Sequence, residues 1–222
     1  SGSLFEQTLE TDQRELRAEV TRDYWREQCY PLHGDALDWV AQHWQSPERL
    51  LGALHALLAD QLPPSSGQLQ DLIVDSLNQR AQALVHLKTP WLQWADELER
   101  LIEQGVEHKQ VNGRMLQRRY FAPWFEALRA WAEDPEQQAP ALTDSAWMRL
   151  SEDGLAEAWK SGEPPRHPAT QNLPLLRQAL AELAAPDQPA LKHAAAWIAE
   201  RFEQEQRRLA QMGFDDMLKR LD

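Results

Sequence analysis

The chain has few of the residues that favour sheets and almost none that form disulfides. Among its 222 residues, Val, Ile and Thr together number 15, against 33 Leu and 29 Ala. Strands favour β-branched residues whereas Leu and Ala favour helices, so this composition predicts an all-α fold. The single cysteine, Cys29, excludes a disulfide framework and fits a reducing, cytoplasmic location.

Positive charge is also in short supply. The sequence contains 23 Lys and Arg against 35 Asp and Glu, which gives a formal net charge of −12. This balance excludes a uniformly basic nucleic-acid-binding surface but leaves room for a local basic patch. Long apolar runs are missing as well. The longest, residues 50–59, is too short to span a bilayer, so we expect no membrane association.

The short motifs of common catalytic and cofactor sites are absent. The sequence contains no GxxxxGK[ST] or GxGxxG phosphate loop and no GxSxG nucleophile motif. The seven histidines form no HExxH pair, and with one cysteine this spacing argues against a metal site. We therefore expect no catalytic, cofactor-binding or metal-ligating residue in this chain.

The chain does contain a succession of helical patterns separated by polar or Pro-rich loops. Ser46-Pro47-Glu48 is a typical helix start, and Thr89-Pro90 is expected to restart a long helix in the same way. Asn112-Gly113 indicates a turn, and Gly213 the end of the last long helix. The expected helices cover residues 11–29, 35–44, 47–59, 68–104 with an interruption at 89–90, 123–133, 144–150, 152–159, 173–183 and 189–212.

Tryptophan is unusually frequent. Because the ten tryptophans fall on the apolar stripes of the expected helices, most should pack between helices rather than stack on bases. They are Trp25, Trp39, Trp44, Trp91, Trp94, Trp124, Trp131, Trp147, Trp159 and Trp197.

One stretch departs from the acidic background. Residues 108–120 contain no acid and carry the cations Lys109, Arg114, Arg118 and Arg119. Lys, Arg and Asn side chains beside a turn suit contact with nucleic-acid phosphates. Arg114 and Arg118 would share a helix face if this part is helical. The alternative is an ordinary basic surface that balances neighbouring acids.

Four segments together carry a family resemblance. They are residues 1–7 (SGSLFEQ), 24–32 (YWREQCYPL), 162–168 (GEPPRHP) and 213–222 (GFDDMLKRLD). In this order and spacing they resemble the beta chain of bacterial exodeoxyribonuclease V, the RecB subunit of RecBCD. The resemblance covers essentially the whole chain and is weakest over residues 45–103. Both ends are typical of a piece cut from the interior of a longer protein.

The resemblance implies an architecture and a parent enzyme. Residues 1–212 would form the irregular, multi-helix 1B subdomain, or arm, inserted in the first motor domain of a superfamily 1 helicase. Residues 213–222 would begin the return into that motor domain. The parent would be an ATP-dependent helicase and nuclease that processes double-strand breaks with the gamma and alpha chains. ATP and magnesium would bind elsewhere in the parent, and this segment would have no catalytic activity.

The resemblance also implies a role for the basic stretch, which would hold duplex DNA phosphates ahead of the fork. The expected DNA contacts are Lys109, Asn112, Arg114, Arg118 and Arg119. The main alternative is a docking module, whose Trp- and Leu-bearing faces would contact the gamma chain or the parent's own motor domains. A third possibility is a free-standing helical enzyme, which no catalytic constellation in the sequence supports.

Overall fold

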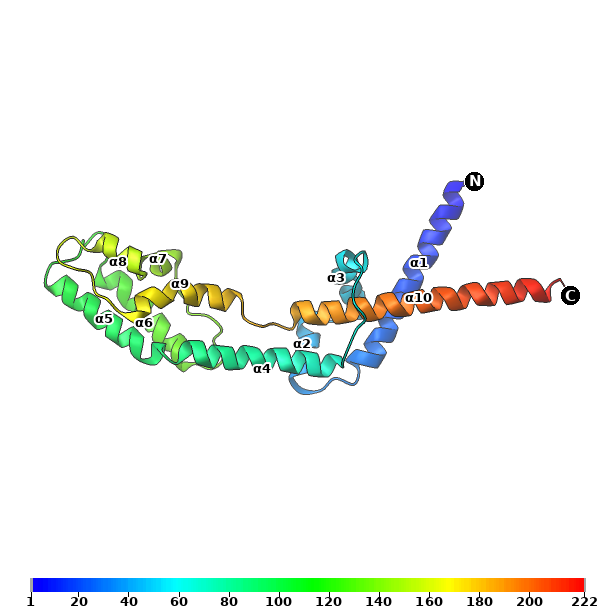
Figure 1. The fold of residues 1–222 in the computed structure, drawn as a ribbon, viewed down its shortest axis with the longest axis horizontal. Helices are drawn as coiled ribbons and strands as arrows, with labels where there is room; N and C mark the ends of the chain where they lie inside the picture. The colour runs from blue at the N-terminus through cyan, green and yellow to red at the C-terminus, as the bar shows by residue number, and fades with distance from the viewer. Residues whose placement is uncertain (1, 222) are drawn as a thin grey trace. The chain divides into compact units, whose positions relative to one another are not determined.

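The computed structural model describes residues 2–221, and within them the chain is all-helical, as the composition predicts (Figure 1). In this range, β geometry is limited to an isolated antiparallel bridge between Val111 and Trp159. The chain divides into two compact units, residues 1–78 with 185–222 (unit 1) and residues 79–184 (unit 2). Ser1 and Asp222, which belong to the two end motifs, lie outside the described residues.

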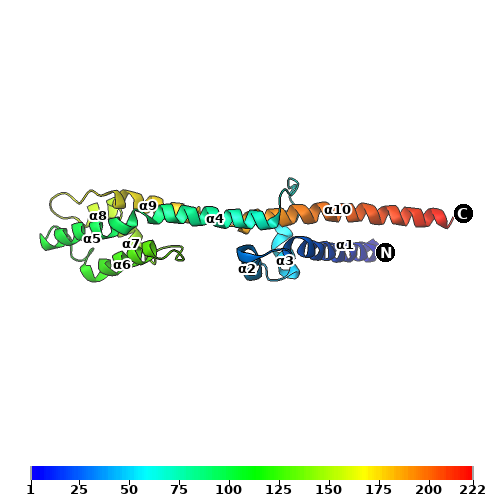
Figure 2. The same ribbon diagram turned by 90° about the horizontal axis from the view of Figure 1, so that it is seen from below.

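Unit 1 combines helices from both ends of the chain. Its elements are α1 (Gly2–Tyr24), the π-helix η1 (Trp25–Cys29), α2 (Gly34–His43), α3 (Pro47–Leu58), the first part of α4 (Leu69–Lys88) and α10 (Asp187–Lys219). Helix α3 packs against both α1 and α10, as Figures 1 and 2 show. The core between these helices includes Tyr24, Trp44, Leu50, Leu54 and Ile198.

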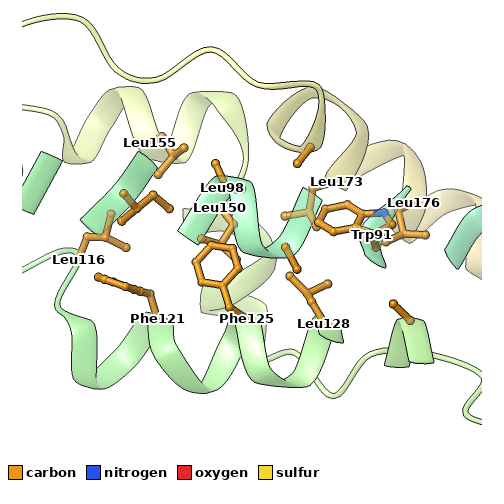
Figure 3. Close-up of a cluster of buried hydrophobic side chains, with 14 of the residues drawn as sticks. Trp91, Leu98, Leu116, Phe121, Phe125, Leu128, Leu150, Leu155, Leu173 and Leu176 are labelled. Carbon is orange, nitrogen blue, oxygen red and sulfur yellow. The ribbon is translucent and has the colours of Figure 1, made fainter. Parts of the chain in front are cut away.

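Unit 2 is formed by the middle of the chain. Besides the rest of α4 it contains α5 (Trp91–Glu107), α6 (Arg118–Glu133), α7 (Asp144–Arg149), α8 (Glu152–Ala158) and α9 (Pro168–Ala181). Helix α5 packs against α6 and α9, and α7 packs against α8 and α9. Figure 3 shows the core between them, where Phe121 and Phe125 of α6 lie below Leu98 of α5 and Leu150.

The tryptophans pack as the sequence predicts. Trp39, Trp44, Trp91 and Trp131 are buried, and the other six are half-buried. All ten belong to or contact one of the two cores. Base stacking on an exposed indole is therefore not a feature of this fold.

Several helices begin earlier or end later than predicted. Helix α1 starts at Gly2 rather than at residue 11. Helix α9 starts at Pro168 rather than at residue 173, because His167 Nδ1 accepts a hydrogen bond from the Ala169 amide and caps the helix there. Helix α6 starts at Arg118 rather than at residue 123. Burial of the apolar face of α6 stabilises the helix by more than the loss of one backbone hydrogen bond at Pro123 destabilises it.

Two breakers behave differently from the prediction. Helix α10 continues through Gly213 to Lys219, because one glycine costs a helix only about 1 kcal/mol among good helix formers. The domain boundary expected at 212/213 thus falls inside a continuous helix. Thr89 does not cap α5: its hydroxyl donates to the Val85 carbonyl, 2.6 Å away, at the end of α4. The prediction at Ser46 is confirmed, since its hydroxyl accepts from the Arg49 amide at 3.2 Å.

Each unit buries one basic group. In unit 1, Tyr24 Oη lies 2.9 Å from His193 Nδ1, and His193 Nε2 lies 3.1 Å from the Gly67 carbonyl. Because that carbonyl can only accept, Nε2 carries the proton and Nδ1 accepts from the phenol. Burial lowers the pKa of His193. In unit 2, Lys88 donates to the carbonyls of Asp134 at 2.5 Å and Gln137 at 2.7 Å.

Candidate nucleic-acid interface

The basic stretch begins where α5 ends in a Schellman motif. The Gln110 amide donates to the Gly105 carbonyl at 2.9 Å, and the Lys109 amide donates to the Val106 carbonyl at 3.0 Å. Lys109 occupies the left-handed position of this motif, with φ 57°. Glycine is the usual residue there, because a side chain in this conformation costs roughly 1–2 kcal/mol. Lys109 is therefore a strained choice, and its side chain is exposed.

The Asn112-Gly113 turn follows, as the sequence predicts. Asn112 Oδ1 accepts from the Arg114 amide at 3.0 Å, and the Asn112 carbonyl accepts from the amides of Met115 and Leu116. Asn112 thus shapes the turn through its own side chain. Arg114 is exposed within the turn, before α6 begins at Arg118. The condition for Arg114 and Arg118 to share a helix face is therefore not met, because the part between them is a turn and not a helix.

Arg118 and Arg119 open α6. Arg118 Nη2 lies 3.3 Å from Glu103 Oε1 of α5, and 76% of the Arg118 side chain is exposed. Arg119 stacks over the Tyr120 ring at 4.7 Å and donates to its hydroxyl at 2.8 Å. Gln117 precedes them and makes no side-chain capping bond. Two cations at an uncapped helix start oppose the helix dipole, and an anion bound there would relieve that opposition.

A second segment, directly after α8, is hydrogen-bonded to this loop, and the sequence did not predict that the two lie together. The Asn112 amide donates to the Ala158 carbonyl at 2.8 Å, and the Lys160 amide donates to the Gln110 carbonyl at 2.9 Å. These bonds place exposed Lys160 beside the basic stretch. No periodic pattern could have revealed this, because the pairing is a single bridge between distant loops.

Close packing at Gly105 holds that segment in place. A Cβ at Gly105 would overlap the indole of Trp159 and lie 3.2 Å from Val111 Cγ2. Glycine therefore allows the Trp159 ring to lie directly on the last turn of α5. Gly105 thus positions both residues of the bridge, Val111 and Trp159.

The cations of this surface have few acidic partners. Of the five expected contacts, Arg118 has an ion pair, and none of the ion pairs within residues 2–221 includes Lys109, Arg114, Arg119 or Lys160. An ion pair near the surface such as Arg118–Glu103 is worth about 0–1 kcal/mol, so it holds Arg118 only weakly. The arrangement suits contact with a phosphate backbone.

The motif at residues 162–168 has a structural part in unit 2. His167 Nδ1 accepts from the Ala169 amide at 3.0 Å, so Nε2 carries the proton and donates to Glu97 Oε2 at 2.7 Å. This hydrogen bond lowers the pKa of the Glu97 carboxyl. The motif fixes the loop before α9 against α5.

Residues 2–221 contain neither a metal-ligating cluster nor a helix that could span a membrane. No group of three or more His, Cys, Asp or Glu side chains in this range could hold a metal ion. None of its helices combines the length and the apolar character that crossing a membrane requires.

Comparison with known proteins links the chain to the RecB subunits of two bacteria. No family model matches it. It is 34% identical to the RecBCD enzyme subunit RecB of Escherichia coli over 229 aligned positions, which cover 100% of this chain and 18% of that protein. The RecB subunit of Haemophilus influenzae is 27% identical over 149 positions, 61% of this chain and 12% of that protein. The chain therefore spans less than a fifth of the length of these relatives. Over its whole length, this all-helical chain is homologous to a segment of RecB.

Proposed function

We propose that this chain is the non-catalytic arm of an ATP-dependent helicase and nuclease of the RecB kind. Residues 1–212 form the 1B subdomain in this proposal, and residues 213–222 begin the return into the motor domain. The basic stretch holds duplex DNA ahead of the fork, while ATP and magnesium act elsewhere in the parent. The parent works with the gamma and alpha chains in double-strand-break processing.

The observation that carries this proposal is the placement of the cations. Lys109 has a strained left-handed backbone, and Arg118 and Arg119 oppose the dipole at the start of α6. Choices that disfavour the fold locally concentrate at functional sites. The cations hold phosphates without reading bases, so the contact allows sliding. Nonspecific affinity of about 10⁻⁴ to 10⁻⁶ M suits that task.

The test is fluorescence anisotropy of a labelled forked duplex, titrated with the protein from low to physiological salt. Wild-type protein should bind more weakly as salt rises, and the double variant Arg118→Glu/Arg119→Glu should not bind. The matched control is Arg207→Glu/Arg208→Glu on α10, an adjacent exposed pair in unit 1 with the same charge change. Equal loss in both variants, or no wild-type binding at low salt, contradicts the proposal.

A docking module remains the second candidate, because the last turns of α10 expose an apolar stripe. Phe214, Met217 and Leu218 recur at helical spacing on α10 and are 48–65% exposed, and Leu221, after the helix ends at Lys219, is 82% exposed. Such a stripe suits contact with the parent's motor domains or the gamma chain. Charge reversal at Arg118 and Arg119 leaves it intact, so an assay of complex assembly separates the two functions.

A further inference from the structure

Lys160 belongs to the basic surface by tertiary structure and not by sequence. Its amide bond to the Gln110 carbonyl and the Asn112–Ala158 bond flank the antiparallel bridge between Val111 and Trp159. Val111 and Trp159 pack on the core, whereas Lys160, next to Trp159 in sequence, is exposed.

Two glycines permit this arrangement. Gly105 leaves room for the Trp159 indole on α5. On the other side of Lys160, Gly162 has φ 74°, and a Cβ there would lie 2.6 Å from Gln110 Nε2. The left-handed backbone and the close approach both favour glycine at 162. The loop from 159 to 162 is thus fixed against the 109–112 segment.

Because lysine is rare in this chain, the proximity of the Lys109 and Lys160 segments is informative. The sequence has five lysines, and unit 2 contains Lys88, Lys109 and Lys160. Lys88 is buried, so Lys109 and Lys160 are the exposed lysines of unit 2. They lie far apart in sequence, yet the bridge brings their segments together. The neighbouring acid Glu157 is paired with Arg149 at 3.7 Å, while Glu163 is exposed.

We propose that Lys160 is a phosphate contact, which binds the backbone of the same nucleic acid strand as Lys109 across the Val111–Trp159 bridge. This inference rests on the proposed function of residues 109–119. It extends that surface to a second segment of the chain. Paired segments lie about 4.8 Å apart, so long lysine side chains on two such segments can reach phosphates of one strand.

The test repeats the anisotropy titration with Lys160→Gln, Lys160→Arg and the control Lys219→Gln, an exposed lysine of unit 1. Loss of one phosphate contact should weaken binding about five- to tenfold at 0.1 M salt. It should also reduce the slope of log K against log salt by about 1. Lys160→Arg should restore both, and Lys219→Gln should change neither.

The outcomes separate this inference from the function on which it rests. If Arg118→Glu/Arg119→Glu abolishes binding while Lys160→Gln keeps wild-type affinity and slope, the inference is overturned and the proposed function stands. An equal loss in Lys160→Gln and Lys219→Gln also overturns it. If wild-type protein binds no duplex at low salt, both are overturned.

Discussion

Unit 1 and unit 2 carry their charge differently. Unit 1 has 11 Lys and Arg against 20 Asp and Glu, whereas unit 2 has 12 against 15. Most of the net charge of −12 therefore belongs to unit 1. The comparison teaches that the average charge of a chain says little about a surface built by one of its parts.

The units also use the same strained backbone in different ways. The non-glycine residues with positive φ in the described chain are Gln45 in unit 1, at 66°, and Lys109 in unit 2, at 57°. Gln45 forms side-chain hydrogen bonds with Arg49 and with the Gln42 carbonyl. The Lys109 ammonium group has no such partner within residues 2–221. In unit 1 the side chain serves the fold, and in unit 2 it is available to a ligand.

The largest effect on stability is expected from core substitutions, which test whether the two units unfold independently. Phe125 is fully buried in unit 2, so Phe125→Ala should cost about 3–5 kcal/mol of stability. Hydrogen exchange measured by mass spectrometry should accelerate in residues 79–184 and stay unchanged in residues 2–78. Leu54→Ala, in the core of unit 1, should give the mirror image. Equal acceleration in both units would show a single cooperative core.

A smaller effect is expected where α5 meets Trp159. Gly105→Ala should displace the indole and cost about 1–3 kcal/mol. Because this moves the paired loops without changing any charge, duplex affinity should fall as well. Gly213→Ala, with open space around its Cβ, should stabilise α10 slightly and leave affinity unchanged. If Gly105→Ala is less stable but binds duplex with wild-type affinity, the packing of Trp159 on α5 is not needed for duplex binding.

Gln45 and Lys109, the two non-glycine residues with positive φ in the described chain, allow a matched pair of substitutions. Each should change the free energy of unfolding by about 1 kcal/mol. Lys109→Gly and Gln45→Gly should each relieve backbone strain and raise the free energy of unfolding by up to about that amount. Lys109→Gly alone should weaken duplex binding. Urea denaturation and anisotropy together measure both effects. If Lys109→Gly leaves duplex affinity unchanged, the strained backbone at Lys109 is not explained by nucleic-acid binding.

The smallest effect concerns pH and unit 1. Since burial lowers the pKa of His193, the unfolded chain takes up the proton first as pH falls below about 6.5. Stability is fully present above that pH and declines below it, toward the lowered pKa of the folded state. His193→Asn should flatten this decline in urea titrations between pH 7 and 5.5. His108→Asn, at an exposed position of unit 2, should not.

Local signals predicted much of the fold but not how its loops meet. The all-α class, the Ser46 cap and the Asn112-Gly113 turn follow from composition and short motifs. Propensity could not show that α10 passes through Gly213, because the cost of one glycine is small beside a long helix. The basic stretch was visible as a charge pattern, whereas Lys160 joins it through a tertiary bridge without periodicity.

The most direct test of where duplex DNA binds is photocrosslinking from one tyrosine in each unit. Tyr120, beside Arg119, is 45% exposed in unit 2, and Tyr30 is 73% exposed in unit 1. Each is replaced by p-benzoylphenylalanine, and the protein is irradiated with a labelled forked duplex at low salt. We predict a crosslink from position 120 and none from position 30. A crosslink from position 30 alone would place the contact in the acidic unit and contradict the assignment to the basic stretch.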